Sequence, residues 1–178
     1  DAVLGWAALC AVVVASVAEG QGILASRLGA DGEGGPHLYL DAPHARHTVG
    51  GRPEEPLPFI RMNGQEIFKF AVRLVVEETQ AVLDGLGLSV ADLDLLVPHQ
   101  ANIRIIEAAR ERLGLAPEQV FTNLERYGNT STASIPLALD EAWRAGRLKP
   151  GDLVVMVGFG GGLTWGTVAV RWSLEGRP

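Results

Sequence analysis

A histidine stands directly behind a short apolar run in this sequence. Residues 95–97 (Leu-Leu-Val) end at Pro98, His99 follows at once, and apolar residues at helical spacing begin at Ile103. This order predicts that His99 lies at the end of a buried strand and ahead of a helix N-terminus, where open α/β sheets place their chemistry. A neutral imidazole there can donate a hydrogen bond to developing negative charge. A loop histidine without a role is the simpler alternative for a lone His.

Two further stretches carry groups suited to the same task. Asn129 lies in residues 127–131 (Tyr-Gly-Asn-Thr-Ser), and residues 158–166 read Gly-Phe-Gly-Gly-Gly-Leu-Thr-Trp-Gly. Each follows a predicted strand, and alternating strands and helices bring strand ends to one edge of a sheet. An imidazole, a carboxamide and the N–H groups of a glycine loop suit an oxyanion better than a metal or a phosphate. Taken singly, Asn129 also fits a turn and the glycines a bulged hairpin.

The elements that must position these groups can be read from periodicity and from start and stop signals. Asn63 and Glu66 resemble a capping box ahead of a helix that Gly85 and Gly87 end, and Gly114 ends the helix after His99. A later helix is expected to be capped by Thr130, Ser131 or Thr132, with Pro136 in its first turn. The predicted strands are residues 22–28, 89–97, 120–124, 153–159 and 164–172, the last two joined by the glycine-rich loop.

Composition limits the class of protein. The 178 residues allow one domain or half of a larger one, and 47% hydrophobic with 20% charged residues indicates a folded globular chain. A net charge of -6 argues against a nucleic-acid partner. The single cysteine, Cys10, excludes an internal disulfide and a thiolate metal cluster, which fits a reducing, cytoplasmic compartment. The chain begins at Asp1 without methionine, which suggests a fragment or a processed chain.

Residues 2–18 are apolar throughout and allow three interpretations. They reach the lower limit of a membrane span, and they also resemble a signal-peptide core whose residues 16–18 (Ser-Val-Ala) could be a cleavage site. Against both, no Lys or Arg precedes the run, and Asp1 stands where positive charge is expected. A fully buried strand also reads as a continuous apolar run. We interpret the segment as a buried strand and expect no membrane association.

Residues 30–58 show little periodicity and many Gly, Pro and His residues. A stretch of this length is either a functional flap or a disordered insertion. His44 and His47, with His37 nearby, have a spacing that could bind a metal. No carboxylate or thiolate is arranged around them on a predicted element, so we expect no metal site.

The motifs together resemble the β-ketoacyl-acyl carrier protein synthase III family of thiolase-fold condensing enzymes. The resemblance is carried by residues 98–102 (Pro-His-Gln-Ala-Asn) with 104–106, by 128–134 (Gly-Asn-Thr-Ser-Thr-Ala-Ser) and by 159–166 (Phe-Gly-Gly-Gly-Leu-Thr-Trp-Gly). Residues 64–69 and 29–32 also match. The resemblance runs from Val3 onward but covers only the C-terminal half of the family's usual length. It implies that residues 1–178 form one thiolase-like α/β half, a mixed five-stranded sheet packed with helices, with 30–58 as a variable loop.

The resemblance also implies an activity and roles for individual residues. The family joins an acyl primer from coenzyme A, usually acetyl, to malonyl-acyl carrier protein, with a cysteine as nucleophile and no cofactor. His99 and Asn129 would polarise the malonyl thioester carbonyl as carbon dioxide leaves, with the Gly161 N–H as a further oxyanion donor. Arg104 would contact coenzyme A phosphates or the carrier protein. The substrate-binding positions implied by the match are Phe159, Arg104, Asn102 and Gly64.

Two departures from the family pattern matter. Residues 5–11 (Gly-Trp-Ala-Ala-Leu-Cys-Ala) replace the family's Phe-Gly-Asp-Gly-Ala-Gly-Ala, and Cys10 lies in a buried-strand context that raises a thiol's pKa. The nucleophilic cysteine therefore belongs to an N-terminal half outside this sequence. We expect the chain to work only with that half, in a complete enzyme that forms a homodimer. The alternatives are a non-catalytic remnant or binding half of the same family, and a membrane-anchored binding protein that would depend on residues 2–18 alone.

Overall fold

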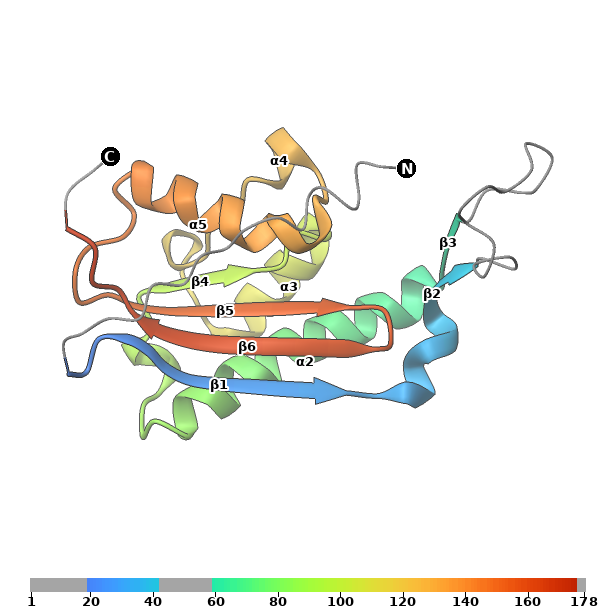
Figure 1. Cartoon of the computed structure of the whole chain (residues 1–178), viewed down its shortest axis with the longest axis horizontal. Coiled ribbons are helices and arrows are strands. Elements are labelled where there is room, and N and C mark those ends of the chain that lie inside the picture. The colour runs from blue at the N-terminus through green and yellow to red at the C-terminus, as the bar shows by residue number, and fades with distance from the viewer. Residues whose placement is uncertain (1–18, 42–58, 176–178) are drawn as a thin grey trace, which may run out of the picture.

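A four-stranded mixed sheet forms the centre of the chain, and helices cover its two faces (Figure 1). The structure is a computed structural model that describes residues 19–41 and 59–175. The strand order is β1-β6-β5-β4. The strands are β1 (Gly22–Ala30), β4 (Leu95–Pro98), β5 (Leu153–Gly160) and β6 (Thr164–Arg171).

The pairing of these strands explains why the sheet is mixed. β4 runs parallel to β5, whereas β6 is antiparallel to both β5 and β1. On the far side of β4, Val120 forms a single parallel bridge to Leu96, and the Phe121 N–H donates to the Leu96 carbonyl at 3.0 Å. The expected strand 120–124 is thus reduced to one bridge, because the short helix α4 (Leu124–Tyr127) begins at once. The mixed α/β sheet is confirmed, and within the described residues it has four strands where five were expected.

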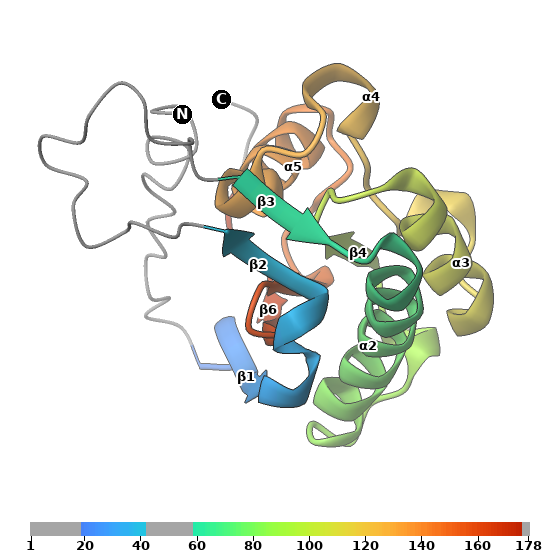
Figure 2. The same ribbon diagram turned by 90° about the vertical axis from the view of Figure 1, so that its right-hand side faces the viewer.

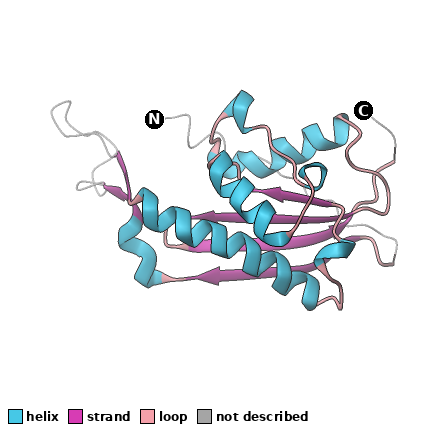
Figure 3. Cartoon of the chain, turned by 180° about the vertical axis from the view of Figure 1, so that it is seen from behind, coloured by secondary structure: helices cyan, strands magenta, loops and turns pink. Residues whose placement is uncertain are grey.

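The helices lie on opposite faces of the sheet, and the strands β4 and β5 are apolar on both sides. α2 (Gly64–Asp84) and α3 (Ile103–Leu113) cover one face, and α5 (Ser134–Arg144) lies on the other (Figures 2 and 3). Leu96 and Val155 belong to the core beneath α2 and α3, while their strand neighbours Leu95 and Val154 pack with α5. This two-sided burial is why these strands read as continuous apolar runs in the sequence.

Local signals set most helix boundaries as expected. The Asn63 side chain accepts a hydrogen bond from the Glu66 N–H at 3.4 Å and caps α2, but the Glu66 carboxylate pairs with Lys69 instead of reaching back. Gly114 ends α3 in the left-handed conformation, with φ of 71°. Pro136 lies in the first turn of α5. The expected hydroxyl cap of α5 is wrong: Ala133 is its N-cap, because the 3-10 helix η5 (Ser131–Ala133) leads directly into it.

Part of the stretch that shows little periodicity in the sequence forms regular structure. Within residues 30–58, the 3-10 helix η1 (Gly32–His37) leads into β2 (Leu38–Asp41), which pairs with β3 (Phe59–Met62) in a separate two-stranded ribbon. The ribbon extends beyond the end of the main sheet (Figure 1). Two more 3-10 helices, η3 (Val90–Asp92) and η4 (Pro117–Gln119), flank β4 and α3 along the chain.

Several sequence-based expectations fall outside the described residues. They concern the apolar run 2–18 with Cys10, and the histidines His44 and His47. Within residues 19–41 and 59–175, no helix has the length and apolar character needed to span a membrane. In the same ranges, no three His, Cys, Asp or Glu side chains gather where they could hold a metal ion.

Candidate active site

His99 occupies the position that the sequence predicts for it. Its backbone N–H donates to the Val157 carbonyl of β5 at 2.8 Å, directly after β4 ends at Pro98. Asn102 then caps α3 by accepting a hydrogen bond from the Arg104 N–H at 2.9 Å. The strand end and the helix start are therefore separated by four residues, and the imidazole is held by the sheet.

The imidazole of His99 has two defined neighbours. Its Nδ1 lies 2.6 Å from the Oγ of Ser134, the first residue of α5. The Phe159 ring lies beside it, edge to face, with a centroid separation of 5.2 Å and an interplanar angle of 79°. The first contact comes from α5 and the second from β5, so two different elements hold the ring. Because both Nδ1 and a ring face are engaged, Nε2 is the nitrogen left for a ligand.

Burial makes His99 harder to protonate. Desolvation lowers the pKa of this histidine from its ordinary 6.5, since removal from water penalises the charged form. The side chain is therefore neutral at pH 7. A neutral imidazole carries one N–H donor and one acceptor nitrogen, so it can stabilise an oxyanion by hydrogen bonding without carrying a full charge.

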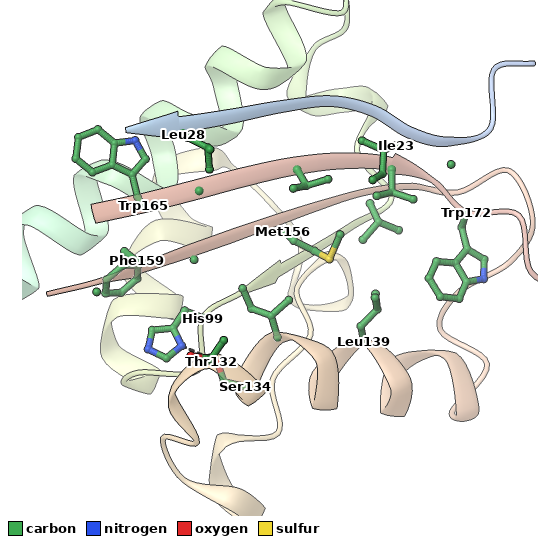
Figure 4. Close-up of a pocket in the computed structure, with 18 of the residues that line it drawn as sticks. Ile23, Leu28, His99, Thr132, Ser134, Leu139, Met156, Phe159, Trp165 and Trp172 are labelled. Carbon is green, nitrogen blue, oxygen red and sulfur yellow. Dashed lines mark hydrogen bonds between the residues drawn. The ribbon is translucent and has the colours of Figure 1, made fainter. Parts of the chain in front are cut away.

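A large apolar groove begins at His99 and runs along the face of the sheet beside α5 (Figure 4). Its volume is about 810 Å³. His99, Phe159 and Trp165 lie at one end and Trp172 at the other (Figure 4). The wall between them is mostly apolar and includes Ile23, Leu28, Leu139, Met156, Val168 and Val170. A polar group at the end of an apolar groove is the usual composition of a small-molecule site.

Gln100 fixes the backbone on which His99 sits. Its side chain is fully buried, and its Nε2 donates to the Pro98 carbonyl at 2.7 Å and to the Phe121 carbonyl at 3.3 Å. Its Oε1 accepts the Asn123 N–H at 3.1 Å. Gln100 thus ties the end of β4 to the chain that follows Val120, and this satisfies backbone groups that would otherwise be buried without partners.

Asn129 lies near the groove, but its side chain is not part of the groove wall. Asn129 is exposed, and its Oδ1 accepts the Ser131 N–H at 2.9 Å. Ser131 and Thr132 line the groove, whereas Asn129 is not among its lining residues. The His99 and Asn129 loops therefore meet at the N-terminus of α5, and the Asn129 carboxamide keeps its Nδ2 group for donation.

Gly161 is the first residue after β5. It lines a second hollow with Gly35, Pro36 and Leu38, outside the groove that contains His99. A Cβ at Gly161 would stand 3.2 Å from the Leu38 carbonyl oxygen, a tight contact, so the close passage of the ribbon favours glycine here. Gly160, one residue earlier, is the turn glycine that lines the groove.

The remaining candidate residues lie at helix starts. Arg104 is exposed on the first turn of α3, five residues after His99. Asn102 is exposed and uses its Oδ1 for the α3 cap. Gly64 is the exposed first residue of α2, with open space where a Cβ would stand. None of these three lines the groove, whereas Phe159 does.

Reasoning from sequence named no role for Ser134 or Gln100, although both lie inside the matched motifs. Ser134 is 2% exposed, and its hydroxyl contacts the imidazole across 35 positions of chain. Gln100 is fully buried. The one available signal was chemical: a Gln beside a buried strand and a Ser within an apolar helix start both need buried partners.

Known proteins resemble the chain over most of its length. A family model described as 3-oxoacyl-[acyl-carrier-protein (ACP)] synthase III C terminal matches residues 83–172. A beta-ketoacyl-[acyl-carrier-protein] synthase III of Symbiobacterium thermophilum is 56% identical, over 92% of this chain and 50% of that protein. One of Bacillus pumilus is 53% identical, over 92% of this chain and 48% of that protein. The chain thus spans about half the length of these relatives.

Solved structures agree with this assignment. The β-ketoacyl-[acyl carrier protein] synthase III of Thermus thermophilus superimposes with a TM-score of 0.78 at 49% identity, over 90% of this chain and 49% of that one. The corresponding enzyme of Aquifex aeolicus gives a TM-score of 0.77 at 42% identity, over 89% of this chain and 46% of that one. The expected thiolase-like half is therefore confirmed, and the chain belongs to the 3-oxoacyl-[acyl-carrier-protein] synthase III family, whose C-terminal part it matches.

Proposed function

We propose that this chain supplies the C-terminal catalytic half of a 3-oxoacyl-acyl carrier protein synthase III. The complete enzyme would condense an acyl-coenzyme A primer, acetyl-coenzyme A as the expected one, with malonyl-acyl carrier protein. The observation that carries the proposal is a neutral imidazole, His99, whose Nδ1 is held by Ser134 and which lies at the end of an apolar groove. Family membership supplies the reaction class.

His99 would act when the malonyl thioester loses its carboxylate. The bond between the malonyl Cα and the carboxylate breaks, carbon dioxide leaves, and the electron pair moves onto the thioester oxygen as an enolate. A hydrogen bond from Nε2–H to that oxygen stabilises the developing charge, more strongly in an apolar groove than in water. The enolate carbon then attacks the acylated cysteine, a C–C bond forms, and the cysteine thiolate is released.

Asn129 would be the second donor to the same oxygen. Its Oδ1 is already occupied by the Ser131 N–H, which leaves the Nδ2 group as the part of the carboxamide that can donate. Asn129 precedes the groove-lining residue Ser131 by two positions, and this closeness supports the role. Gly161 would add its backbone N–H as a further donor, as the family resemblance implies, and the close passage of Leu38 favours a residue without a side chain there.

The acyl-accepting cysteine would come from an N-terminal half outside this sequence. The groove beside α5 supports such a partner, because the described residues leave an apolar face of the sheet exposed at residues such as Ile23 (51% exposed) and Leu28 (88% exposed). A second half seated there would close the groove over His99. The complete enzyme would be cytoplasmic and homodimeric, without a cofactor.

Arg104 would recognise the anionic part of a substrate. An exposed guanidinium on the first turn of α3 suits the phosphates of coenzyme A or an acidic carrier protein. Asn102 supports it by capping the same helix end. Gly64 and Phe159 complete the proposed substrate-binding set, Gly64 from the start of α2 and Phe159 from the groove.

Reconstitution tests the proposal. The chain is combined with the N-terminal half of the Symbiobacterium thermophilum relative, and condensation of acetyl-coenzyme A with malonyl-acyl carrier protein is measured. The combined halves should form the acetoacetyl product, and neither half should do so alone. His99→Ala should lower kcat about 100- to 1,000-fold, as expected for loss of one oxyanion donor.

His37→Ala is the matched control, because His37 lies in η1 outside the groove. It should leave the rate unchanged. Halves that associate without condensing would indicate a non-catalytic binding half instead. An active complex that tolerates His99→Ala would refute the assigned role of the imidazole.

A further inference from the structure

The hydroxyl of Ser134 has an unusually complete set of neighbours. Ser134 is 2% exposed, and its Oγ lies 2.6 Å from His99 Nδ1. The same Oγ accepts the Gln100 backbone N–H at 3.3 Å. One serine at the start of α5 therefore contacts both the imidazole and the backbone immediately after it.

The proton count at this oxygen favours one direction for its hydrogen bond. A hydroxyl has one proton to give and two lone pairs to offer, and Gln100 uses one lone pair. Among the residues that the structure describes, Nδ1 is the neighbour of Oγ that can accept its proton, provided that Nδ1 is unprotonated. A proton on Nδ1 would make both neighbours donors and would leave the Ser134 proton without an acceptor in a nearly water-free position, which native structures avoid.

We propose that Ser134 is a positioning residue that donates its hydroxyl proton to His99 Nδ1 and so holds the imidazole as the tautomer protonated on Nε2. This deepens the proposed function and depends on it in one respect, namely that Nε2–H is the donor to the enolate oxygen. This hydroxyl works in the opposite sense to the carboxylate that accepts the Nδ1–H of many catalytic histidines, because it donates to Nδ1 and leaves the proton on Nε2. In the described part of the chain, no carboxylate is bonded to His99.

The surroundings of the ring prevent the two nitrogens from exchanging places. The Phe159 ring lies against His99 at 5.2 Å, and the backbone on both sides is fixed by the hydrogen bonds of His99 to Val157 and of Gln100 to Pro98. Rotation of the imidazole would take Nδ1 away from Ser134. The tautomer and the orientation are therefore set together.

Nitrogen-15 NMR of the full chain, labelled on histidine, tests the tautomer directly. The spectrum is recorded above pH 7, and the His99 signals are assigned by their loss in His99→Gln. The expected result is an unprotonated Nδ1 and a protonated Nε2. A protonated Nδ1 would overturn the proposal with no variant needed.

Three variants test whether Ser134 is the cause. Ser134→Ala should reduce the separation between the two His99 nitrogen signals as the tautomers begin to interchange, and Ser134→Thr, which keeps the hydroxyl, should restore it. Thr132→Ala removes a hydroxyl from the same groove wall without removing a contact to the ring, and it should leave the two His99 nitrogen signals unchanged. Unchanged His99 signals in a folded Ser134→Ala chain would overturn the proposal, and if that variant does not fold, the parent spectrum alone decides.

The same substitution has a distinct kinetic signature in the reconstituted enzyme. Ser134→Ala should lower kcat by on the order of tenfold or more while KM is unchanged, because it perturbs a transition-state donor and not substrate binding. The NMR result needs neither the second half nor turnover. If the combined halves do not condense although His99 is protonated on Nε2, the proposed function is wrong and the role of Ser134 stands. If the complex is active although His99 is protonated on Nδ1, the role of Ser134 is wrong and the proposed function stands.

Discussion

His99 is defined by its isolation from charge. Its pKa is lowered by burial, and its closest contacts are the Ser134 hydroxyl and the Phe159 ring. A histidine in such a setting is suited to donating one hydrogen bond as a neutral imidazole, and its positively charged form is disfavoured. The residue therefore matches the stabilisation of an enolate better than general acid–base work at low pH.

This isolation predicts a pH dependence of stability. Because the pKa of folded His99 lies below the ordinary 6.5, the unfolded chain binds a proton between the two values that the folded chain excludes. The contribution of His99 to the free energy of unfolding is fully present above about pH 6.5. It falls as the pH drops towards the folded-state pKa, by at most about 1.4 kcal/mol per pH unit.

Urea unfolding at a series of pH values checks this, with His99→Gln as the reference that cannot titrate. The difference in the free energy of unfolding between the parent chain and the variant should shrink as the pH falls below about 6.5. A difference that stays constant between neutral and acidic pH would show that the folded-state pKa of His99 is not lowered.

At the scale of elements, α4 and the loop that carries Asn129 are held by one carboxylate on α5. Glu141 accepts hydrogen bonds from Asn123 Nδ2 at 2.8 Å, from an Arg126 amino group at 2.8 Å and from the Tyr127 hydroxyl at 2.7 Å. Its side chain is 18% exposed. A four-residue helix has little stability of its own, so α4 depends on this anchor for its position.

Replacing Glu141 should loosen α4 and the Asn129 loop together. Glu141→Ala should lower the free energy of unfolding by about 2 kcal/mol, since hydrogen bonds to a charged group are lost and the buried Asn123 amide loses its acceptor. Amide hydrogen exchange over residues 124–131 should quicken. The pKa of Tyr127, which its hydrogen bond to Glu141 raises, should fall towards its ordinary value.

Asp140→Ala provides the matched control for this experiment. Asp140 is the neighbouring acid on α5, paired with Arg144 at 2.8 Å in an exposed i,i+4 ion pair. Its loss should cost less than about 0.5 kcal/mol and leave exchange at α4 unaltered. Equal effects of the two substitutions would show that Glu141 is no special anchor.

At the scale of the whole molecule, the described residues cover one face of the sheet only in part. α2 and α3 cover the first face, whereas on the second face the groove runs beside α5 along β5, β6 and β1 (Figure 4). Exposed apolar area of this kind on a protein surface marks a contact with another body. A partner that covers the groove would also enclose His99, so assembly and completion of the site would occur together.

Leu28→Glu tests that link. Leu28 lines the groove and is 88% exposed, so the change should alter the stability of the chain itself by less than about 0.5 kcal/mol. It should nevertheless weaken association with the N-terminal half of a relative by at least about tenfold, because it places a charge in an apolar interface. Binding is measured by titration calorimetry.

Leu40→Glu is the control for the whole-molecule prediction. Leu40 is likewise exposed, at 59%, but lies on β2 outside the groove. It should leave the association unchanged. If Leu28→Glu binds as tightly as the parent chain, the second half does not sit in this groove.

The sequence by itself determined the local frame of the site. Apolar runs and glycine or asparagine boundaries predicted β1, β5, β6, α2 and α3, and they placed His99 between a strand and a helix. These features depend on residues within one or two turns of each other, so periodicity and capping reveal them. The same logic failed where distant packing overrides local preference, as at the 120–124 strand and at the hydroxyl cap of α5.

Only the tertiary structure decided which groups meet. Ser134 reaches His99 over 35 positions, Glu141 reaches Asn123 over 18, and Gly161 lies close to the Leu38 carbonyl. Each of these outcomes depends on how α5 and the β2–β3 ribbon pack against the sheet. Local spacing carries no information about that packing, because contacts between elements are fixed by the shape and burial of whole faces and not by neighbours in the chain.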